Sequence, residues 1–426
     1  MKPSLHFDVV VIGAGVAGLT AATRLAQSGA SVCVVAKGMG STHLAPGLVD
    51  VLGYDPERVS SPAESLPSFV EAHPDHPYAV VGVEGIGAAL EWFGGLVDAG
   101  PQPSYRYVGE LARNHVLPTA LGAKRPSALV PESFAGGELV ARRGSSSGPI
   151  CVVGMRVLRD FHASLCAANL ERDGVAARGV QLEVDVGRAE ANSLGLARRM
   201  DDHKFRAAFA AQLLPLLRAD ERVGLPAILG LRDPHRAWSE LESRLGHAVF
   251  EIPTLPPSAS GIRVYDALRS ALRAAGGRLV IGARVVEVER DGDRVTAVRA
   301  HTSGHDHVYG ARWVVVATGG FTSGAIELGS DWQARETALG LQLRGMPGDG
   351  EPRYKGDYFA DQPMARVGIA VDSSLLADGT SNVLVAGAAL PGAEPWREGS
   401  GEGIALSSGL FAARTVLERE GAAAAA

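Results

Sequence analysis

The sequence contains little cysteine and no large excess of either charge. Three cysteines, Cys33, Cys151 and Cys166, occur among 426 residues. They are too few for a disulfide framework, and an iron–sulfur cluster usually needs four thiolates. None of them forms a C-x-x-C pair, which excludes a zinc ribbon. A formal net charge of −6 argues against nucleic acid as the main partner.

Long apolar runs are also missing. No stretch reaches the 18 or more uncharged apolar residues that a membrane-spanning helix needs. The apolar run from Val9 to Ala22 superficially resembles a signal peptide, but it contains three glycines and no convincing cleavage site follows it. We therefore expect a cytoplasmic chain that reaches a membrane only through partners.

Glycine, in contrast, is abundant, at 53 of 426 residues, where an average protein has ~7%. Gly13, Gly15 and Gly18 form a G-x-G-x-x-G motif in the order that dinucleotide binding requires. Gly13 permits a tight turn, Gly15 lets the backbone approach a pyrophosphate, and Gly18 lets the following helix pack closely. A predicted strand (7–12) precedes the motif, and a helix (19–28) and a second strand (31–36) follow it.

The acidic residue that usually ends the second strand and binds a ribose is missing. Ala36 and Lys37 occupy that place, which weakens the case for NAD and for a standard adenosine contact. Two other segments favour a flavin. VVVATGG (314–320) resembles the A-T-G strand of two-dinucleotide-type flavoproteins. NVLVAG (382–387), with GSGEG (399–403) and a helix after it, resembles their C-terminal flavin motif, although Ala388 replaces a frequent acid.

The order of predicted elements indicates an α/β fold: a Rossmann-like, two-dinucleotide-type flavin-binding domain with an inserted α/β cap domain. The flavin-binding domain is expected in two parts, 1–55 and 253–420. A loop-rich segment (56–149), with one helix at 85–99, and an alternating α/β segment (150–252) separate them. Ser260 is expected to cap a helix at 262–275, three strands (278–281, 284–290 and 295–301) are expected to form a meander, and 421–426 is expected to be a disordered tail.

Several segments outside the glycine motifs resemble one family, the B subunit of the anaerobic glycerol-3-phosphate dehydrogenase. They are PTLPPSASGIR (253–263), RYKGDYFADQP (353–363), ICVVGM (150–155), AHPDHPY (72–78) and HLAPGLVDVL (43–52). Because they are distributed over nearly the whole chain, the resemblance is specific. Glu402 departs from it, since it lies where the family pattern is more purely glycine.

The resemblance implies one flavoprotein of a three-protein complex. Its partners would be a second flavoprotein, the A subunit, and an iron–sulfur protein, the C subunit, which attaches to the inner face of the membrane. The complex would oxidise sn-glycerol 3-phosphate to dihydroxyacetone phosphate and pass electrons to quinone. The flavin implied for this chain is FMN, whereas the glycine fingerprint alone suggests FAD.

The candidate site residues follow from these motifs. For the cofactor they are Gly13, Gly15, Gly18, Lys37, Thr318, Gly319, Gly387, Gly401 and Gly403. For catalysis we consider Lys355 and Arg263 as phosphate-binding cations, Tyr354 as a donor to a substrate oxygen, and His43 as a base. Each has a structural alternative: a solvated ion pair, a helix-surface arginine, a packed aromatic ring and a loop histidine. His73 and His76 supply only two possible metal ligands, so no metal is expected there.

Two alternative functions stay open. One is a stand-alone flavin oxidoreductase of the fumarate-reductase type. The other is an electron-relay or assembly flavoprotein whose partner holds the substrate.

Overall fold

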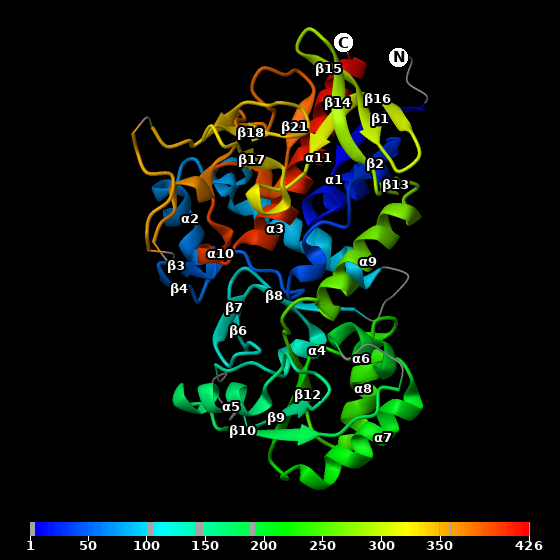
Figure 1. Cartoon of the computed structure of the whole chain (residues 1–426), viewed down its shortest axis with the longest axis vertical. Coiled ribbons are helices and arrows are strands. Elements are labelled where there is room, and N and C mark those ends of the chain that lie inside the picture. The colour runs from blue at the N-terminus through cyan, green and yellow to red at the C-terminus, as the bar shows by residue number, and fades with distance from the viewer. Residues whose placement is uncertain are drawn as a thin grey trace.

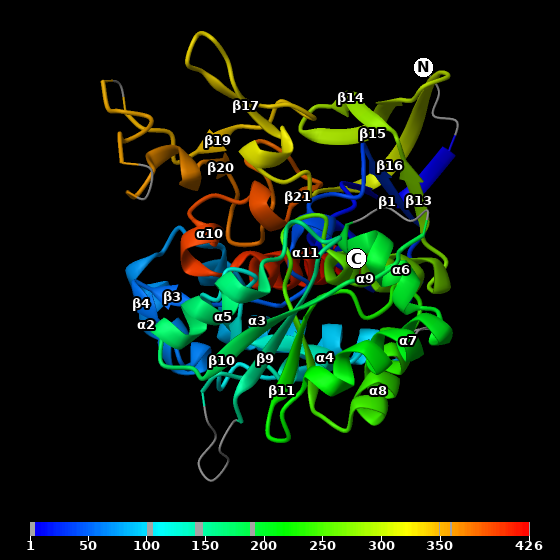
Figure 2. The same ribbon diagram turned by 60° about the horizontal axis from the view of Figure 1, so that its bottom comes forward.

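The computed structural model describes residues 5–99, 105–140, 148–187, 192–348, 350–357 and 360–425. The described residues form two main sheets, each with its own helices (Figure 1), and five small two-stranded sheets. The larger sheet lies in the upper part of that view and the smaller one in the lower part. Figure 2 shows the lower part from beneath, with its strands in front of the red C-terminal helix α11.

The larger sheet has the strand order β13-β2-β1-β16-β15-β14, and β21 also pairs with β16. Strands β13, β2, β1, β16 and β21 are parallel, whereas β14, β15 and β16 form an antiparallel meander. The predicted meander of 278–281, 284–290 and 295–301 is therefore wrong in its first strand, which pairs with β2 instead. The bounds are β1 (Leu5–Ile12), β2 (Val32–Ala36), β13 (Arg278–Ile281), β14 (Arg284–Asp291), β15 (Arg294–His301), β16 (Asp306–Val316) and β21 (Val383–Val385).

Three long helices pack with this sheet. Helix α1 (Val16–Gln27) contacts β1, β2 and β16, and lies beside α9 (Ala259–Ala274) and α11 (Gly401–Ala425). The side chain that caps α9 is Ser258, whose hydroxyl group accepts a hydrogen bond from the Gly261 amide at 3.0 Å. The predicted cap Ser260 is wrong, because its hydroxyl group donates to the Pro46 carbonyl. Helix α11 continues to Ala425, into the segment that was predicted to be a disordered tail.

The smaller sheet is entirely parallel and has the order β10-β9-β11-β12. Its helices alternate with its strands, and it encloses a hydrophobic core of its own. The predicted α/β fold with an inserted α/β layer is thereby confirmed. The bounds are β9 (Ile150–Met155), α5 (Ala163–Arg172), β10 (Ala177–Leu182), α6 (Ser193–Met200), α7 (His203–Leu213), η2 (Leu214–Leu216), β11 (Arg222–Pro226), α8 (Pro234–Leu245) and β12 (Val249–Ile252).

The segment predicted to be loop-rich contains two longer helices, α2 (Pro62–Ala72) and α3 (Pro77–Asp98), besides the single-turn helix α4 (Glu132–Ala135). Within the described part of the chain, one helix, α3, is long enough and apolar enough to cross a membrane; this statement rests on length and composition only. Its Ile86, Leu90 and Phe93 are buried in the core around the larger sheet. The short elements between β2 and β9 are η1 (Thr42–Leu44), β3 (Tyr54–Asp55), β4 (Glu57–Arg58), β5 (Tyr107–Gly109), β6 (His115–Pro118), β7 (Lys124–Ser127), β8 (Leu129–Pro131) and α4.

The segment between β16 and α11 consists mostly of short elements. They are η3 (Phe321–Ser323), β17 (Ile326–Leu328), β18 (Ala334–Glu336), β19 (Leu343–Arg344), η4 (Pro363–Arg366), β20 (Gly368–Ile369), β21, η5 (Gly387–Ala389) and α10 (Pro395–Glu398).

Candidate functional site

The carboxyl ends of four parallel strands meet at one edge of the larger sheet. The Gly13 amide donates to the Val35 carbonyl at 3.0 Å, and the Ala317 amide donates to the Ile12 carbonyl at 2.9 Å. The Ala386 amide donates to the Val316 carbonyl at 2.9 Å. These bonds bring together the glycine-rich segments that follow β1, β16 and β21. In open α/β sheets, ligands bind at this kind of edge.

The three glycines of the first motif have different surroundings. A Cβ atom on Gly13, whose φ is +116°, would lie 2.2 Å from the Ala317 carbonyl oxygen. A Cβ atom on Gly18 would lie 2.1 Å from the Gly13 carbonyl oxygen. A Cβ atom on Gly15 would meet nothing within 4 Å. Gly13 and Gly18 are therefore required by the close approach of neighbouring backbone, whereas Gly15 faces open space.

That open space lies at the amino end of α1. Gly15 is the N-cap residue of α1, and no side chain caps the helix there. The first amides of a helix have no intrahelical acceptor, and the helix dipole favours an anion beside them. The hydroxyl group of Thr318, which follows β16, is buried and has no hydrogen-bond partner. The Nδ1 atom of His43 is also buried without a partner. The free face of Gly15 and the unsatisfied hydroxyl group of Thr318, in the segment next to Gly13, fit a phosphate-bearing ligand.

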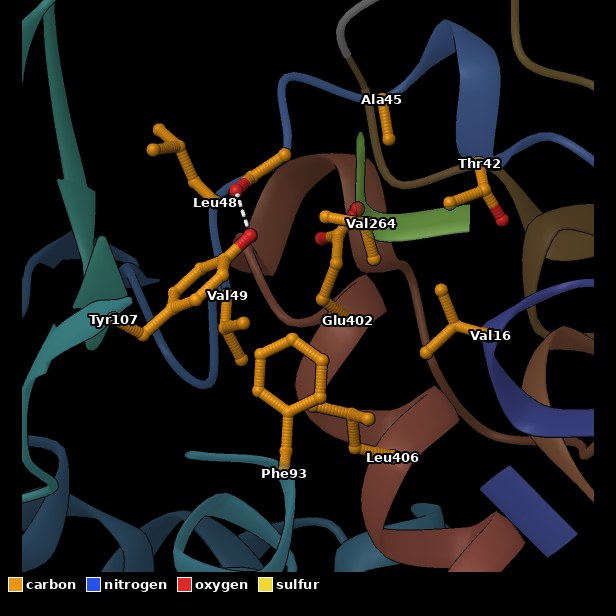
Figure 3. A pocket seen from close by; sticks show the side chains of 11 residues that line it. Val16, Thr42, Ala45, Leu48, Val49, Phe93, Tyr107, Val264, Glu402 and Leu406 are labelled. Atoms are coloured by element: carbon orange, nitrogen blue, oxygen red, sulfur yellow. Dashed lines mark hydrogen bonds between the residues drawn. The ribbon is translucent and has the colours of Figure 1, made fainter. Parts of the chain in front are cut away.

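A pocket lies between the amino ends of α1 and α11 (Figure 3). It is a partly open hollow, and the empty space within it, open solvent included, is about 300 Å³. Figure 3 shows its lining side chains, which come from α1, the loop after β2, α3, β5, α9 and α11 and are mostly apolar. They are Val16, Thr42, Ala45, Gly47, Leu48, Val49, Phe93, Tyr107, Val264, Glu402 and Leu406. The hydroxyl group of Tyr107 donates to the Gly47 carbonyl at 2.6 Å. Glu402 supplies the one carboxyl group among these lining residues.

Glu402 lies in the first turn of α11, and its carboxyl group points into this pocket (Figure 3). Burial, reinforced by the negative charge of Asp50, raises the pKa of Glu402 to about 7. Arg125 acts in the opposite direction, but this arginine forms an ion pair with Asp50, which also accepts a hydrogen bond from Ser127. The pocket therefore contains a carboxyl group that titrates near neutral pH.

A set of buried side chains holds the turn that precedes α11. His76 lies 3.2 Å from Glu398 through its Nε2 atom, and its Nδ1 atom accepts a hydrogen bond from the Tyr78 amide. Glu398 accepts a hydrogen bond from the Ser400 hydroxyl group at 2.7 Å. The Tyr78 hydroxyl group donates to the Val51 carbonyl at 2.8 Å. His76 therefore positions the GSGEG turn through Glu398. The other histidine of this segment, His73, forms a hydrogen bond with the Phe69 carbonyl.

Arg263 is located away from solvent, in an ion pair that connects α9 with β12. Its guanidinium group contacts both carboxylate oxygens of Glu251, at 2.7 and 3.0 Å. The side chain of Arg263 is 2% exposed and that of Glu251 is 0% exposed. The Nε atom of Arg263 donates to the Gly230 carbonyl at 2.8 Å. This geometry favours a structural role over phosphate binding, because all three guanidinium nitrogens are occupied within the protein.

Of the other predicted catalytic residues, His43 adjoins the pocket lining, whereas Tyr354 and Lys355 do not belong to it. Tyr354 is 53% exposed and Lys355 is also exposed, and both belong to the loop before η4. His43 is partly buried in η1, next to the pocket residue Thr42. Lys37 is exposed after β2. The structure thus places His43 next to the site, while Lys355 and Tyr354 lie on a different surface loop.

The predicted glycines of the second half fall at the same edge of the sheet. Gly319 and Gly387 both have positive φ angles, of +81° and +73°. Gly387 donates its amide to the Ser408 hydroxyl group, which fixes η5 against α11. Gly401 begins α11, and the Gly403 amide donates to the Asp50 carbonyl. Within this turn, sequence reasoning did not name Glu402 as a functional candidate. The sequence feature that could have indicated it is the glutamate at a position where the family pattern is more purely glycine.

Comparison with known proteins agrees with this geometry. A family model described as "FAD binding domain" matches residues 8–404. A protein of Pectobacterium atrosepticum, named as the B subunit of anaerobic glycerol-3-phosphate dehydrogenase, is 32% identical over 426 residues, which cover 97% of this chain and 99% of the relative. This chain belongs to that family. A Halobacterium salinarum protein, named as a probable B subunit of the same enzyme, is 33% identical over 438 residues, with the same coverage.

These relatives confirm the predicted family resemblance, and the family model shows that the chain has a flavin-binding domain of oxidoreductase type. The residues at the sheet edge agree with a flavin: Gly15 leaves room for a phosphate at the amino end of α1, and the side chains that line the pocket beside it are mostly apolar. Among solved structures, the quinol fumarate reductase of E. coli has a TM-score of 0.47 at 11% identity, and the match covers 99% of this chain and 72% of that chain.

Proposed function

We propose that this chain carries the flavin of a complex that oxidises sn-glycerol 3-phosphate to dihydroxyacetone phosphate. The observation that supports this most is the pocket between the amino ends of α1 and α11. It lies in a chain that is matched over nearly its full length by relatives named as the B subunit of anaerobic glycerol-3-phosphate dehydrogenase. A bound flavin supplies the acceptor for a hydride from the substrate carbon. The turn at Gly13–Gly18 would hold the phosphates, and the pocket with α11 would hold the ring system.

The electrons must leave this chain through another protein or a diffusible acceptor. Cys33, Cys151 and Cys166 are buried, and burial raises the pKa of each thiol to about 11, so they are poor cluster ligands. We infer that a second flavoprotein (the A subunit) and an iron–sulfur protein (the C subunit) complete the complex and pass electrons to quinone. The chain would then lie at the inner face of the cell membrane, held there by its partners.

A second candidate function is an electron relay whose partner holds the substrate. One observation favours it: the described pocket residues include no lysine or arginine, and Arg263 is already paired with Glu251. A phosphate substrate normally needs a cation near it. Under this alternative the chain binds flavin but does not react with glycerol 3-phosphate by itself.

The identity of the flavin is open between FMN and FAD. Ala36 and Lys37 at the end of β2 support FMN, since no carboxylate is present there to hold an adenosine ribose. The match to the FAD-binding family supports FAD. Mass spectrometry of the cofactor released from the purified chain distinguishes the two.

The function is tested by adding glycerol 3-phosphate to the purified, flavin-loaded chain without oxygen. Bleaching of the flavin absorbance in the chain alone supports catalysis here. Bleaching only after both partner proteins are added supports the relay. A chain that binds neither FMN nor FAD refutes the proposed function.

A further inference from the structure

One carboxyl group in the pocket is not accounted for by cofactor binding. Glu402 points into the pocket from α11 among the apolar side chains of Val16, Phe93 and Val264 (Figure 3). Glu402 is partly exposed as a residue, but the apolar side chains around its carboxylate remove part of the hydration of this group, which makes its charged form costly. An apolar side chain would suit a purely structural position better, so the presence of glutamate here calls for a chemical reason.

The charged and titratable groups that act on Glu402, or feel its charge, come from four elements of the structure. Asp50, in the loop after η1, and Arg125, on β7, form an ion pair next to it. Tyr107, on β5, and Tyr78, on α3, feel the Glu402 charge, which contributes to raising the pKa of both phenols. The remaining lining residues, from α1 and α9, are uncharged. Among the residues that the structure describes, the cation acting on Glu402 is Arg125, which Asp50 already neutralises.

We propose that Glu402 is the residue that takes up a proton when the flavin in this pocket is reduced, and releases it when the electrons leave. This inference rests on the proposed function, since it needs a flavin in the pocket. Two electrons enter the flavin from the substrate or from an electrode. The Glu402 carboxylate becomes a carboxylic acid with one proton drawn from water, which offsets part of the added negative charge.

The direction of this coupling follows from electrostatics. Negative charge that arrives in an apolar pocket raises the pKa of a neighbouring carboxyl group, because like charges disfavour its ionised form. Glu402 already titrates near pH 7 before reduction, owing to burial and to Asp50. Between about pH 7 and the higher pKa that Glu402 has beside the reduced flavin, reduction therefore adds a proton to Glu402. Below that pH the carboxyl group is protonated in both redox states and exchanges no proton.

The experiment measures the midpoint potential of the flavin-loaded chain between about pH 6 and pH 9, for the native protein and for Glu402→Gln. For a two-electron couple, a tenfold change in proton activity shifts the potential by about 30 mV for each proton taken up. The native protein should show a slope about 30 mV per pH unit steeper than Glu402→Gln, from about pH 7 up to the pKa of Glu402 in the reduced protein. The two slopes should coincide below that pH. Glu418→Gln, at a 69% exposed position of the same helix, is the matched control and should behave like the native chain.

A second variant supports the test without changing Glu402. Asp50→Asn removes the negative charge that raises the pKa of Glu402 and leaves Arg125 to lower it. The pH at which the steep slope begins should therefore fall in Asp50→Asn. Equal slopes in the native chain and Glu402→Gln, with flavin bound to both, overturn the inference and leave the proposed function intact. A chain that binds no flavin overturns both.

Discussion

Replacing Arg263 by methionine should destabilise the protein strongly while leaving its surface unchanged. Methionine keeps most of the aliphatic stem but removes the guanidinium group, so the carboxylate of Glu251 stays buried without its cation. Glu251 would retain two hydrogen bonds, from the Leu229 amide at 2.7 Å and the Ser133 hydroxyl group at 2.8 Å. It would lose two contacts to the guanidinium group.

The size of the loss follows from the burial of both partners. Breaking a fully buried ion pair from one side costs about 3–5 kcal/mol, because an uncompensated charge remains. With a urea m-value of about 3 kcal/mol/M, this corresponds to a fall in the unfolding midpoint of about 1 M or more. The matched control is Arg269→Met on the same helix, where a surface pair with Asp266 at 2.9 Å contributes about 0–1 kcal/mol.

The assay is urea unfolding, followed by tryptophan fluorescence; one of the five tryptophans, Trp238, reports on β12, since its Nε1 atom donates to the Val249 carbonyl. Adding Glu251→Gln to Arg263→Met should recover part of the lost stability, because the buried charge is then removed. The reasoning is refuted if Arg263→Met is as stable as Arg269→Met. A stable Arg263→Met that instead no longer reacts with glycerol 3-phosphate would restore the phosphate-binding role of Arg263.

Three further outcomes are expected. Gly15→Ala should unfold like the native chain but retain flavin less well in equilibrium dialysis, because a Cβ atom at Gly15 meets only open space in the protein. Gly13→Ala should lower the free energy of unfolding by more than about 1 kcal/mol, because the φ angle of Gly13 is +116°. Equal stability of the two variants would contradict this. His76 and hydrogen bonds hold the pKa of Glu398 below its usual 4.5, so this stabilisation is present above about pH 4.5 and lost as the pH falls below it. Glu398→Gln should therefore flatten the fall in urea midpoint between about pH 5 and pH 3, and an unchanged slope would show that other carboxyl groups dominate. Thiol reagents at about pH 8 should modify no cysteine in the folded chain but all three after unfolding; fast labelling of the native protein would disprove the raised pKa of Cys33, Cys151 and Cys166.

Local sequence patterns were sufficient for most of the strands and helices. The apolar run that becomes β1, the GAGVAG turn and the alternation over 150–252 each carry their own signal, since they depend on periodicity and glycine geometry. Pairing partners were harder to predict. The strand β13 was assigned to a meander because it precedes β14 directly, yet it pairs in parallel with β2, which lies far earlier in the chain. Nothing in the local sequence of β13 distinguishes these two arrangements.

The sequence by itself determined the glycine framework and the family, because those depend on residue types at short, fixed spacings. Only the tertiary structure decided which charges are paired inside the protein and which face the pocket. Arg263 and Glu251 are 12 residues apart and Arg125 and Asp50 are 75 apart, and no spacing rule predicts such contacts. The same packing left Glu402 at the amino end of α11 in an apolar pocket. Its protonation was therefore beyond sequence reasoning, because the burial of a carboxyl group and the charges packed around it set its pKa.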